Sequence, residues 1–208
     1  MAYDVDLDWL IAQVEAVLEK NRVIETRSWN GHSLSCVFHA PLLHPKPNYP
    51  QWLPPGLRWL WRPWQVGYPH QWFWDSCAHA IVLSLLDSDL AKSELSSLLY
   101  AQQEDGFIPH MIWNRKGMHW VDRLAAQFYP SRYFSPYIQP PVLAETVRSI
   151  YQRDNDVDFI RRVIAQLKKY YLYLNRVRNR SGDGLLEIII SYESGKDRSP
   201  EYDVIYGE

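Results

Sequence analysis

The chain has 208 residues, which is enough for one sizeable domain. Its 22 basic and 24 acidic residues give a formal charge of -2, so no excess of either sign draws it to nucleic acid or to an anionic membrane. No apolar run approaches the roughly 18 residues of a membrane span, the acidic start lacks a signal-peptide pattern, and Cys36 and Cys77 lack zinc-like spacing. We therefore expect a cytoplasmic protein with free thiols, and the sequence leaves its oligomeric state open.

Five helices are predicted, each from apolar residues that recur at helical spacing. They cover residues 6 to 24, about Ser76 to Leu86, the segment from Asp89 to Leu99, residues 142 to 151, and residues from Asp156 or Asp158 to 174. Asp89 can serve as the N-cap of the third helix, and the two prolines before the fourth helix suit a first turn. Strand signals are weak, and the best candidate is the short run LLEIII at 185 to 190.

A faint repeat follows the third and fifth predicted helices. Asp105-Gly106 and Asp183-Gly184 are each followed by two large apolar residues. One repeat would therefore contain two helices and a long loop, which is the pattern of stacked helical hairpins. This pattern favours an all-α fold.

Aromatic residues are unusually frequent, with ten Trp and fourteen Tyr. Six of the Trp fall between residues 52 and 74, and eight of the fourteen Pro fall between 41 and 69. Trp is costly to leave in water and Pro interrupts regular backbone, so this stretch should be an ordered, packed loop. A second long loop, between the third and fourth helices, is also rich in Trp and Tyr. Ordered loops of such length are usually functional.

Several kinds of catalytic site lack their sequence signatures. The seven His residues form no i, i+4 pair and are not flanked by cysteine pairs, so no zinc site is predicted. No Gly-x-Ser-x-Gly elbow and no glycine-rich phosphate loop occurs. We expect neither a metal nor a cofactor.

Carboxylates interleaved with aromatic residues indicate a different chemistry. A Trp or Tyr ring can cover the C-H face of a sugar, while Asp, Glu, Gln and His hydrogen-bond its hydroxyl groups. The chain combines both types in HQWFWD (70 to 75), QEDGFIPHMIW (103 to 113), MHWVD (118 to 122) and YIQPP (137 to 141). The predicted ligand is therefore a small carbohydrate.

Structural roles remain open for the same residues. Asp75 stands before an apolar run and would stabilise a helix as its N-cap, although capping gives no reason for the neighbouring Trp72 and Trp74. Both Trp could themselves belong to the core. Gln139 is ambiguous between a capping role and a ligand contact. By composition, residues 191 to 203 (SYESGKDRSPEYD) form a solvated surface loop.

Four segments together resemble the α/α-toroid glycoside hydrolases of family 63 and their short bacterial relatives, the mannosylglycerate and glucosylglycerate hydrolases. They are YPHQWFWDSCAHAI, DGFIPHMIW, SPYIQPPVLAETV and YESGKDRSPEYD, in the family's order, between residues 68 and 203. The resemblance implies a partial (α/α)6 toroid of helical hairpins with long aromatic-rich loops at one rim. It also implies an inverting hydrolase of α-glucosides or α-mannosides, such as those of glycerate. In such an enzyme an acid protonates the leaving oxygen and a carboxylate activates water.

The resemblance assigns roles to individual residues. Asp197, in the Glu-Ser-Gly-x-Asp motif, corresponds to the general acid. Trp74, Asp75 and Gln139 correspond to residues that line the sugar subsite. The further expected neighbours in the pocket are Tyr68, Trp72, His110, Trp113 and Glu193. An acid that works near neutral pH must be partly desolvated, which a Trp-rich pocket provides.

Two departures from the family pattern bear on catalysis. Tyr192 replaces a Trp of the motif, and Arg198 replaces the Asn beside the acid. A positive charge at Arg198 favours the ionised form of Asp197 and so opposes proton donation, unless the guanidinium points away or pairs with Glu193 or Glu201.

The family's catalytic base lies well after the general-acid motif, and a six-hairpin toroid needs many more helices than the five predicted here. Residues 1 to 208 are therefore expected to form the N-terminal portion of a single glycosidase domain, as a fragment or a natural truncation, and to be inactive alone. The alternative is a non-catalytic helical module that binds carbohydrate or protein, or a gene remnant. Another toroid enzyme, such as an epimerase or phosphorylase, would share the architecture but not the four motifs.

Overall fold

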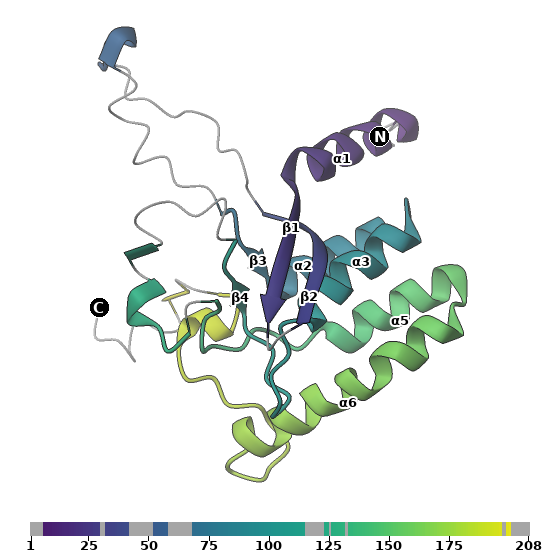
Figure 1. The fold of residues 1–208 in the computed structure, drawn as a ribbon, viewed down its shortest axis with the longest axis vertical. Helices are drawn as coiled ribbons and strands as arrows, with labels where there is room; N and C mark the ends of the chain where they lie inside the picture. Colours follow the sequence, from purple (N-terminus) through teal and green to yellow (C-terminus); the bar gives the residue numbers. More distant parts are fainter. Residues whose placement is uncertain are drawn as a thin grey trace.

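The computed structural model describes residues 6–29, 32–41, 52–57, 68–114, 123–124, 126–131, 133–196 and 199–200. Within these residues the chain contains five α-helices, an antiparallel β-hairpin and a second, very short strand pair. Four helices form two helical hairpins that lie side by side, and the β-hairpin packs against the first of them (Figure 1). No helix in this described part combines the length and apolar character that a membrane span requires.

Helix α1 (Leu7–Asn21) confirms the first predicted helix, although it is shorter than expected. Asp6 caps it by accepting the backbone N-H of Trp9 at 3.0 Å. The helix ends at Asn21 because the chain turns directly into a strand at Arg22. Most of its side chains are exposed, and it extends away from the rest of the molecule in Figure 1.

The β-hairpin was not predicted, so the expectation of an all-α fold is wrong in this respect. Strand β1 (Arg22–Trp29) pairs with β2 (His32–His39) along its whole length. Charged Glu25 and Arg27 occupy inward positions of β1, which removes the apolar alternation that normally reveals a strand. Residues 185 to 190, the best candidate from sequence, form no strand.

The first helical hairpin consists of α2 (Phe73–Leu83) and α3 (Ser88–Leu99). Helix α2 begins earlier than predicted, so Asp75 lies in its first turn and is not its N-cap; the residue at the N-cap is Trp72, which makes no side-chain capping bond. Helix α3 is capped by Asp87 rather than by the predicted Asp89. Both helices are confirmed, but their predicted caps are wrong.

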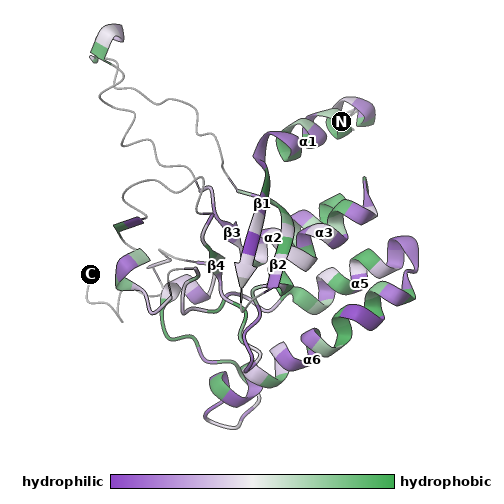
Figure 2. Cartoon of the chain, in the orientation of Figure 1, coloured by the Kyte–Doolittle hydropathy of each residue, from purple (hydrophilic) through white to green (hydrophobic). Residues whose placement is uncertain are grey.

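The second helical hairpin consists of α5 (Leu143–Asp154) and α6 (Val157–Arg178), which confirms the last two predicted helices. Asp156, one of the two expected starting residues, caps α6 by accepting the N-H of Phe159 at 2.8 Å. Hydrophobic and hydrophilic residues occupy different faces of these helices, as Figure 2 illustrates. The apolar faces meet α2 and α3 in one core that includes Phe73, Leu98 and Tyr170.

The predicted repeat has a structural counterpart at the two Asp-Gly positions. Asp105 accepts the backbone N-H of Phe107 at 3.0 Å, and Asp183 accepts that of Leu185 at 2.9 Å. Gly106 and Gly184 both have positive φ, at 102° and 86°. Each helical hairpin is therefore followed by the same kind of Asp-Gly turn, in which glycine permits a left-handed backbone.

A buried carboxylate joins the β-hairpin to the first helical hairpin. Glu94 of α3 is fully buried and accepts hydrogen bonds from the backbone N-H of His39 at 2.7 Å and from the hydroxyl of Ser76 at 2.5 Å. Its contact with His39 Nδ1 is 2.8 Å. Because a buried carboxylate is tolerated only when it is well hydrogen-bonded, this network fixes β2 against α2 and α3.

Candidate active site

Five of the nine predicted site residues line one pocket. Tyr68, Trp72, Trp74, Asp75 and Gln139 surround a cavity of about 280 Å³ together with Pro41 and Gly195. Its walls combine three aromatic rings with a carboxylate and a carboxamide. This is the combination that the sequence suggested for a sugar, and with Pro41 and Gly195 the pocket is assembled from four separate segments of the chain.

The start of helix α2 supplies most of the pocket. The short strand β3 (Gln71–Trp72) pairs with β4 (Met111–Ile112), and the backbone N-H of Phe73 donates to the carbonyl of His110 at 2.8 Å. These bonds fix the residues that enter the helix. Asp75 sits in the first turn, where the positive end of the helix dipole favours a carboxylate.

Gln139 has both a structural contact and a place in the pocket wall. Its side-chain oxygen accepts the backbone N-H of Trp74 at 3.0 Å, so it satisfies a donor at the start of α2. The bond leaves its amide N-H groups as the available donors toward the cavity. The indole N-H of Trp72 is buried and has no hydrogen-bond partner among the described residues, so Trp72 presents its ring and not its N-H to the pocket.

His110 and Trp113 do not line this pocket. His110 lies behind it, with its ring 5.2 Å from that of Trp72 and 5.6 Å from that of Tyr137. Burial lowers the pKa of His110 to about 4, so the imidazole is neutral near pH 7. Trp113 packs edge-on against His70 at 4.8 Å and lines a different cavity.

Glu193 is held by the protein itself. Its side chain is fully buried, and its two oxygens accept a bidentate pair of bonds from Arg178, at 2.8 Å and 2.5 Å. They also accept the backbone N-H groups of Ile138 at 3.2 Å and Ile189 at 2.8 Å. We call this arrangement the Arg178–Glu193 clamp. It joins the end of α6, the segment that leads to Ser194 and the segment that contains Gln139, so Glu193 is interpreted as a positioning residue.

The remaining predicted site residue, Asp197, lies outside the described residues, as do Arg198 and Glu201. The clamp answers part of the question about Arg198, since Glu193 is already paired with Arg178. Most of the Trp-rich and Pro-rich loop also lies outside the described residues. Within its described part, Trp52 is 74% exposed.

Gly195 belongs to the pocket and was not singled out from the sequence. Its φ is +75°, and a Cβ at this position would lie 2.6 Å from the Trp74 ring. The signal was present in the motif YESGKD, because a glycine between polar loop residues often marks a position that needs a left-handed backbone.

Replacement of Gly195 by alanine is expected to destabilise the chain more than replacement of Gly182. Both glycines have φ of +75°, but a Cβ at Gly182 meets nothing within 4 Å. The left-handed backbone should cost about 1 to 2 kcal/mol in both variants. Only Gly195→Ala should also displace the Trp74 ring. Urea unfolding measures the loss of stability in each variant. The indole N-H resonance of Trp74 reports the displacement of its ring. Equal effects at the two sites would contradict close packing of Gly195 on Trp74.

Comparisons with known proteins relate most of the chain to glycoside hydrolases. A family described as the mannosylglycerate hydrolase MGH1-like glycoside hydrolase domain matches residues 68–208. The mannosylglycerate hydrolase of Thermus thermophilus is 34% identical over 146 residues, which cover 65% of this chain and 35% of that protein. The glucosylglycerate hydrolase of Mycolicibacterium hassiacum is 31% identical over 157 residues, which cover 67% and 35%.

A solved structure covers nearly the whole chain. The family 63 mannosylglycerate hydrolase of Thermus thermophilus, in complex with Tris and D-glycerate, superposes with a TM-score of 0.66 at 27% identity. The match covers 93% of this chain and 39% of that one. The chain spans about a third of the length of the curated relatives that it matches. Since the family match extends over more than half of its residues, the chain belongs to the mannosylglycerate hydrolase MGH1-like glycoside hydrolase family.

Proposed function

We propose that this chain forms the N-terminal portion of an (α/α)6 glycosidase domain, with its long aromatic-rich loops at one rim. The whole domain hydrolyses an α-linked glucoside or mannoside of a small acid such as glycerate. The observation that carries this proposal is the pocket of Tyr68, Trp72, Trp74, Asp75 and Gln139. Relatives named for mannosylglycerate and glucosylglycerate hydrolysis support it.

The pocket residues have complementary tasks in sugar binding. Trp74 is 38% exposed and offers its ring to the C-H face of the pyranose. Asp75 accepts hydrogen bonds from sugar hydroxyls, while the amide of Gln139 donates. The mixture fixes both the face and the orientation of the ring. Such a site binds a neutral sugar without needing a metal or a cofactor.

Asp197 is the proposed general acid, two residues beyond Gly195 of the pocket wall. It protonates the glycosidic oxygen as the bond to the leaving group breaks. A carboxylate from the portion of the family domain that residues 1 to 208 do not span activates water on the opposite face of the sugar. The two steps together invert the anomeric centre. The 208-residue chain binds sugar but does not turn it over alone.

The proposed acid is tested in a chimera, in which residues 68–208 replace the matching segment of the Thermus thermophilus mannosylglycerate hydrolase. We expect hydrolysis of mannosylglycerate, with release of the inverted anomer observed by NMR. Asp197→Asn should lower kcat by at least about 100-fold, the usual range for loss of a general acid. The matched control is Asp158→Asn, because Asp158 is 73% exposed on α6.

Retention of activity by Asp197→Asn would exclude the acid role. An inactive but folded chimera, combined with sugar binding by the 208-residue chain, would favour the alternative of a non-catalytic carbohydrate-binding module.

We further propose that the protein acts in the cytoplasm, since its two cysteines are unpaired and buried, as is usual in a reducing compartment.

A further inference from the structure

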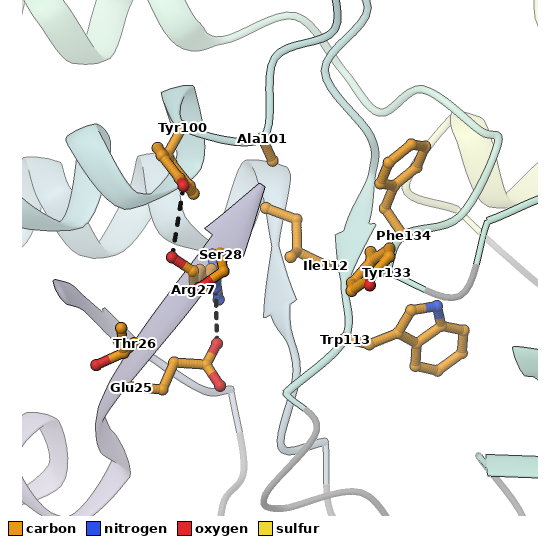
Figure 3. Close-up of a pocket in the computed structure, with 10 residues that line it drawn as sticks. All are labelled: Glu25, Thr26, Arg27, Ser28, Tyr100, Ala101, Ile112, Trp113, Tyr133 and Phe134. Atoms are coloured by element: carbon orange, nitrogen blue, oxygen red, sulfur yellow. Dashed lines mark hydrogen bonds and ion pairs between the residues drawn. The ribbon is translucent and has the colours of Figure 1, made fainter. Parts of the chain in front are cut away.

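A second cavity lies between the β-hairpin and the loop that follows β4. It has a volume of about 340 Å³, and none of the residues that line it lines the Asp75 pocket. Figure 3 shows Glu25 and Arg27 of β1 on one side and the aromatic side chains of Trp113, Tyr133 and Phe134 on the other. The volume is within the range of small-molecule sites in proteins.

Arg27 is fixed on the polar side of this cavity. Its Nε donates to Glu25 at 2.7 Å, and its Nη1 donates to the side chain of Gln71 at 2.6 Å and to the carbonyl of Ser97 at 3.2 Å. The guanidinium also lies over the Phe38 ring, 4.8 Å from its centroid. Its Nη2 has almost no accessible surface and no hydrogen-bond partner among the described residues, so this atom does not face the cavity. Arg27 therefore holds Glu25 in place at the cavity wall.

Glu25 provides an acceptor in the cavity wall. Its side chain is 7% exposed, and one oxygen is bonded to Arg27. The carboxylate and the guanidinium neutralise each other, so the cavity has no net charge to attract an anion. The carboxylate can accept a hydrogen bond from a hydroxyl group of a ligand.

The opposite side of the cavity is aromatic and held by backbone bonds. The N-H of Trp113 donates to the carbonyl of Tyr133 at 2.9 Å, and Phe134 bridges to Ile112. Trp113 is 5% exposed, and its buried indole N-H has no hydrogen-bond partner within the described part of the chain. Tyr133 remains 44% exposed and can contact a ligand at the mouth of the cavity. Rings of this kind suit the C-H face of a pyranose.

We infer that this cavity is a second carbohydrate site, which binds a neutral monosaccharide unit through Glu25, held in place by Arg27, and through the rings of Trp113 and Tyr133. The site is separate from the proposed active site and does not depend on the proposed reaction. A carboxylate such as glycerate is disfavoured, because the paired Glu25 and Arg27 leave no net positive charge to attract it.

The test uses the indole N-H resonances of the 208-residue chain, assigned by single Trp→Phe variants. Methyl α-D-glucopyranoside and methyl α-D-mannopyranoside are titrated separately, with D-glycerate as the anionic comparison. We expect the Trp113 resonance to shift with at least one glycoside and to stay unchanged with D-glycerate. Trp72 and Trp74 report independently on the Asp75 pocket.

Two variants in each pocket separate the sites. Glu25→Gln and Tyr133→Ala should weaken the sugar-dependent shift of Trp113 at least tenfold while leaving the response of Trp74 unchanged. Asp75→Asn and Tyr68→Ala are the matched variants of the first pocket and should have the opposite effect. Glu25→Gln keeps the shape of the side chain, and an unchanged amide spectrum without ligand verifies its fold.

Different failures overturn different proposals. If the Trp113 resonance does not shift with either glycoside, the second site is overturned. The same holds if the sugar-dependent shift is unchanged in Glu25→Gln and Tyr133→Ala. A shift of the Trp113 resonance with D-glycerate but not with the glycosides would indicate an anion site and would also refute the inference. If the Trp72 and Trp74 resonances do not shift with either glycoside, sugar binding in the proposed active site is contradicted instead.

Discussion

Replacement of Glu193 by glutamine is expected to lower the free energy of unfolding by about 3 to 5 kcal/mol. The side chains of Arg178 and Glu193 are 5% and 0% exposed, so the variant leaves a buried guanidinium without its counter-charge. The neutral amide also presents N-H groups to a site that needs acceptors for Arg178, Ile138 and Ile189. Chemical denaturation followed by far-UV circular dichroism measures the loss.

Two controls isolate the charge pair. Replacing both residues, as Arg178→Met with Glu193→Leu, removes the unpaired charge and should recover the larger part of the stability lost in the single variant. Glu145→Gln breaks an exposed ion pair with Arg148 and should change stability little. A double variant as unstable as Glu193→Gln would mean that the backbone hydrogen bonds, and not the charge pair, hold the three segments together.

The clamp should also influence ligand binding at a distance. Glu193 accepts the backbone N-H of Ile138, the residue before Gln139 of the pocket wall. Its loss is therefore expected to weaken sugar binding at Trp74 even under conditions where the variant stays folded. Unchanged binding in the folded variant would restrict the clamp to a purely stabilising role.

Acidification from pH 6.5 to pH 4 is expected to cost the fold about 3 kcal/mol through His110 alone. Burial lowers the pKa of this imidazole from 6.5 to about 4. Between these values the unfolded chain binds a proton that the folded chain does not, so stability falls as the pH falls. Well above pH 6.5 neither state is protonated at His110, and well below pH 4 both are, so the contribution of His110 no longer changes there.

The measurement compares His110→Asn with the parent chain by urea unfolding at pH 7 and at pH 4.5. Carboxylates and the other histidines titrate in both proteins, so their effects cancel in the difference. The variant should lose less stability than the parent over this interval. Parallel pH profiles would show that His110 is not held in its neutral form.

The helices could be predicted because their apolar residues recur with helical spacing, whereas the start of α2 depends on a tertiary contact. Helix α2 needs no local cap at Asp75, because the side chain of Gln139 reaches the N-H of Trp74 from a distant part of the sequence. Likewise, polar Arg27 could occupy an inward position of β1 because Gln71 and Ser97 accept its hydrogen bonds. A prediction made from neighbouring residues in the sequence does not detect such distant partners.

More of the pocket residues than of the surrounding structure could be predicted from the sequence. Interleaved Trp and carboxylate residues, together with the family resemblance, gave Trp72, Trp74 and Asp75, which do meet Gln139 in one cavity. The sequence did not distinguish pocket walls from their supports, because His110 and Glu193 have the same polar character as ligand contacts. Only their burial and hydrogen bonds assign them a supporting position.

The distribution of the pocket along the chain has a consequence for synthesis on the ribosome. Helices α2 and α3 are neighbours in sequence and can pair early, but Gln139 reaches the backbone N-H of Trp74, and Gly195 the Trp74 ring, only after most of the 208 residues have emerged. The nascent chain must therefore carry Trp72 and Trp74 uncovered for much of its translation. Slow translation upstream of Gly195 would prolong that exposure, and chaperones that bind aromatic segments would find their target there.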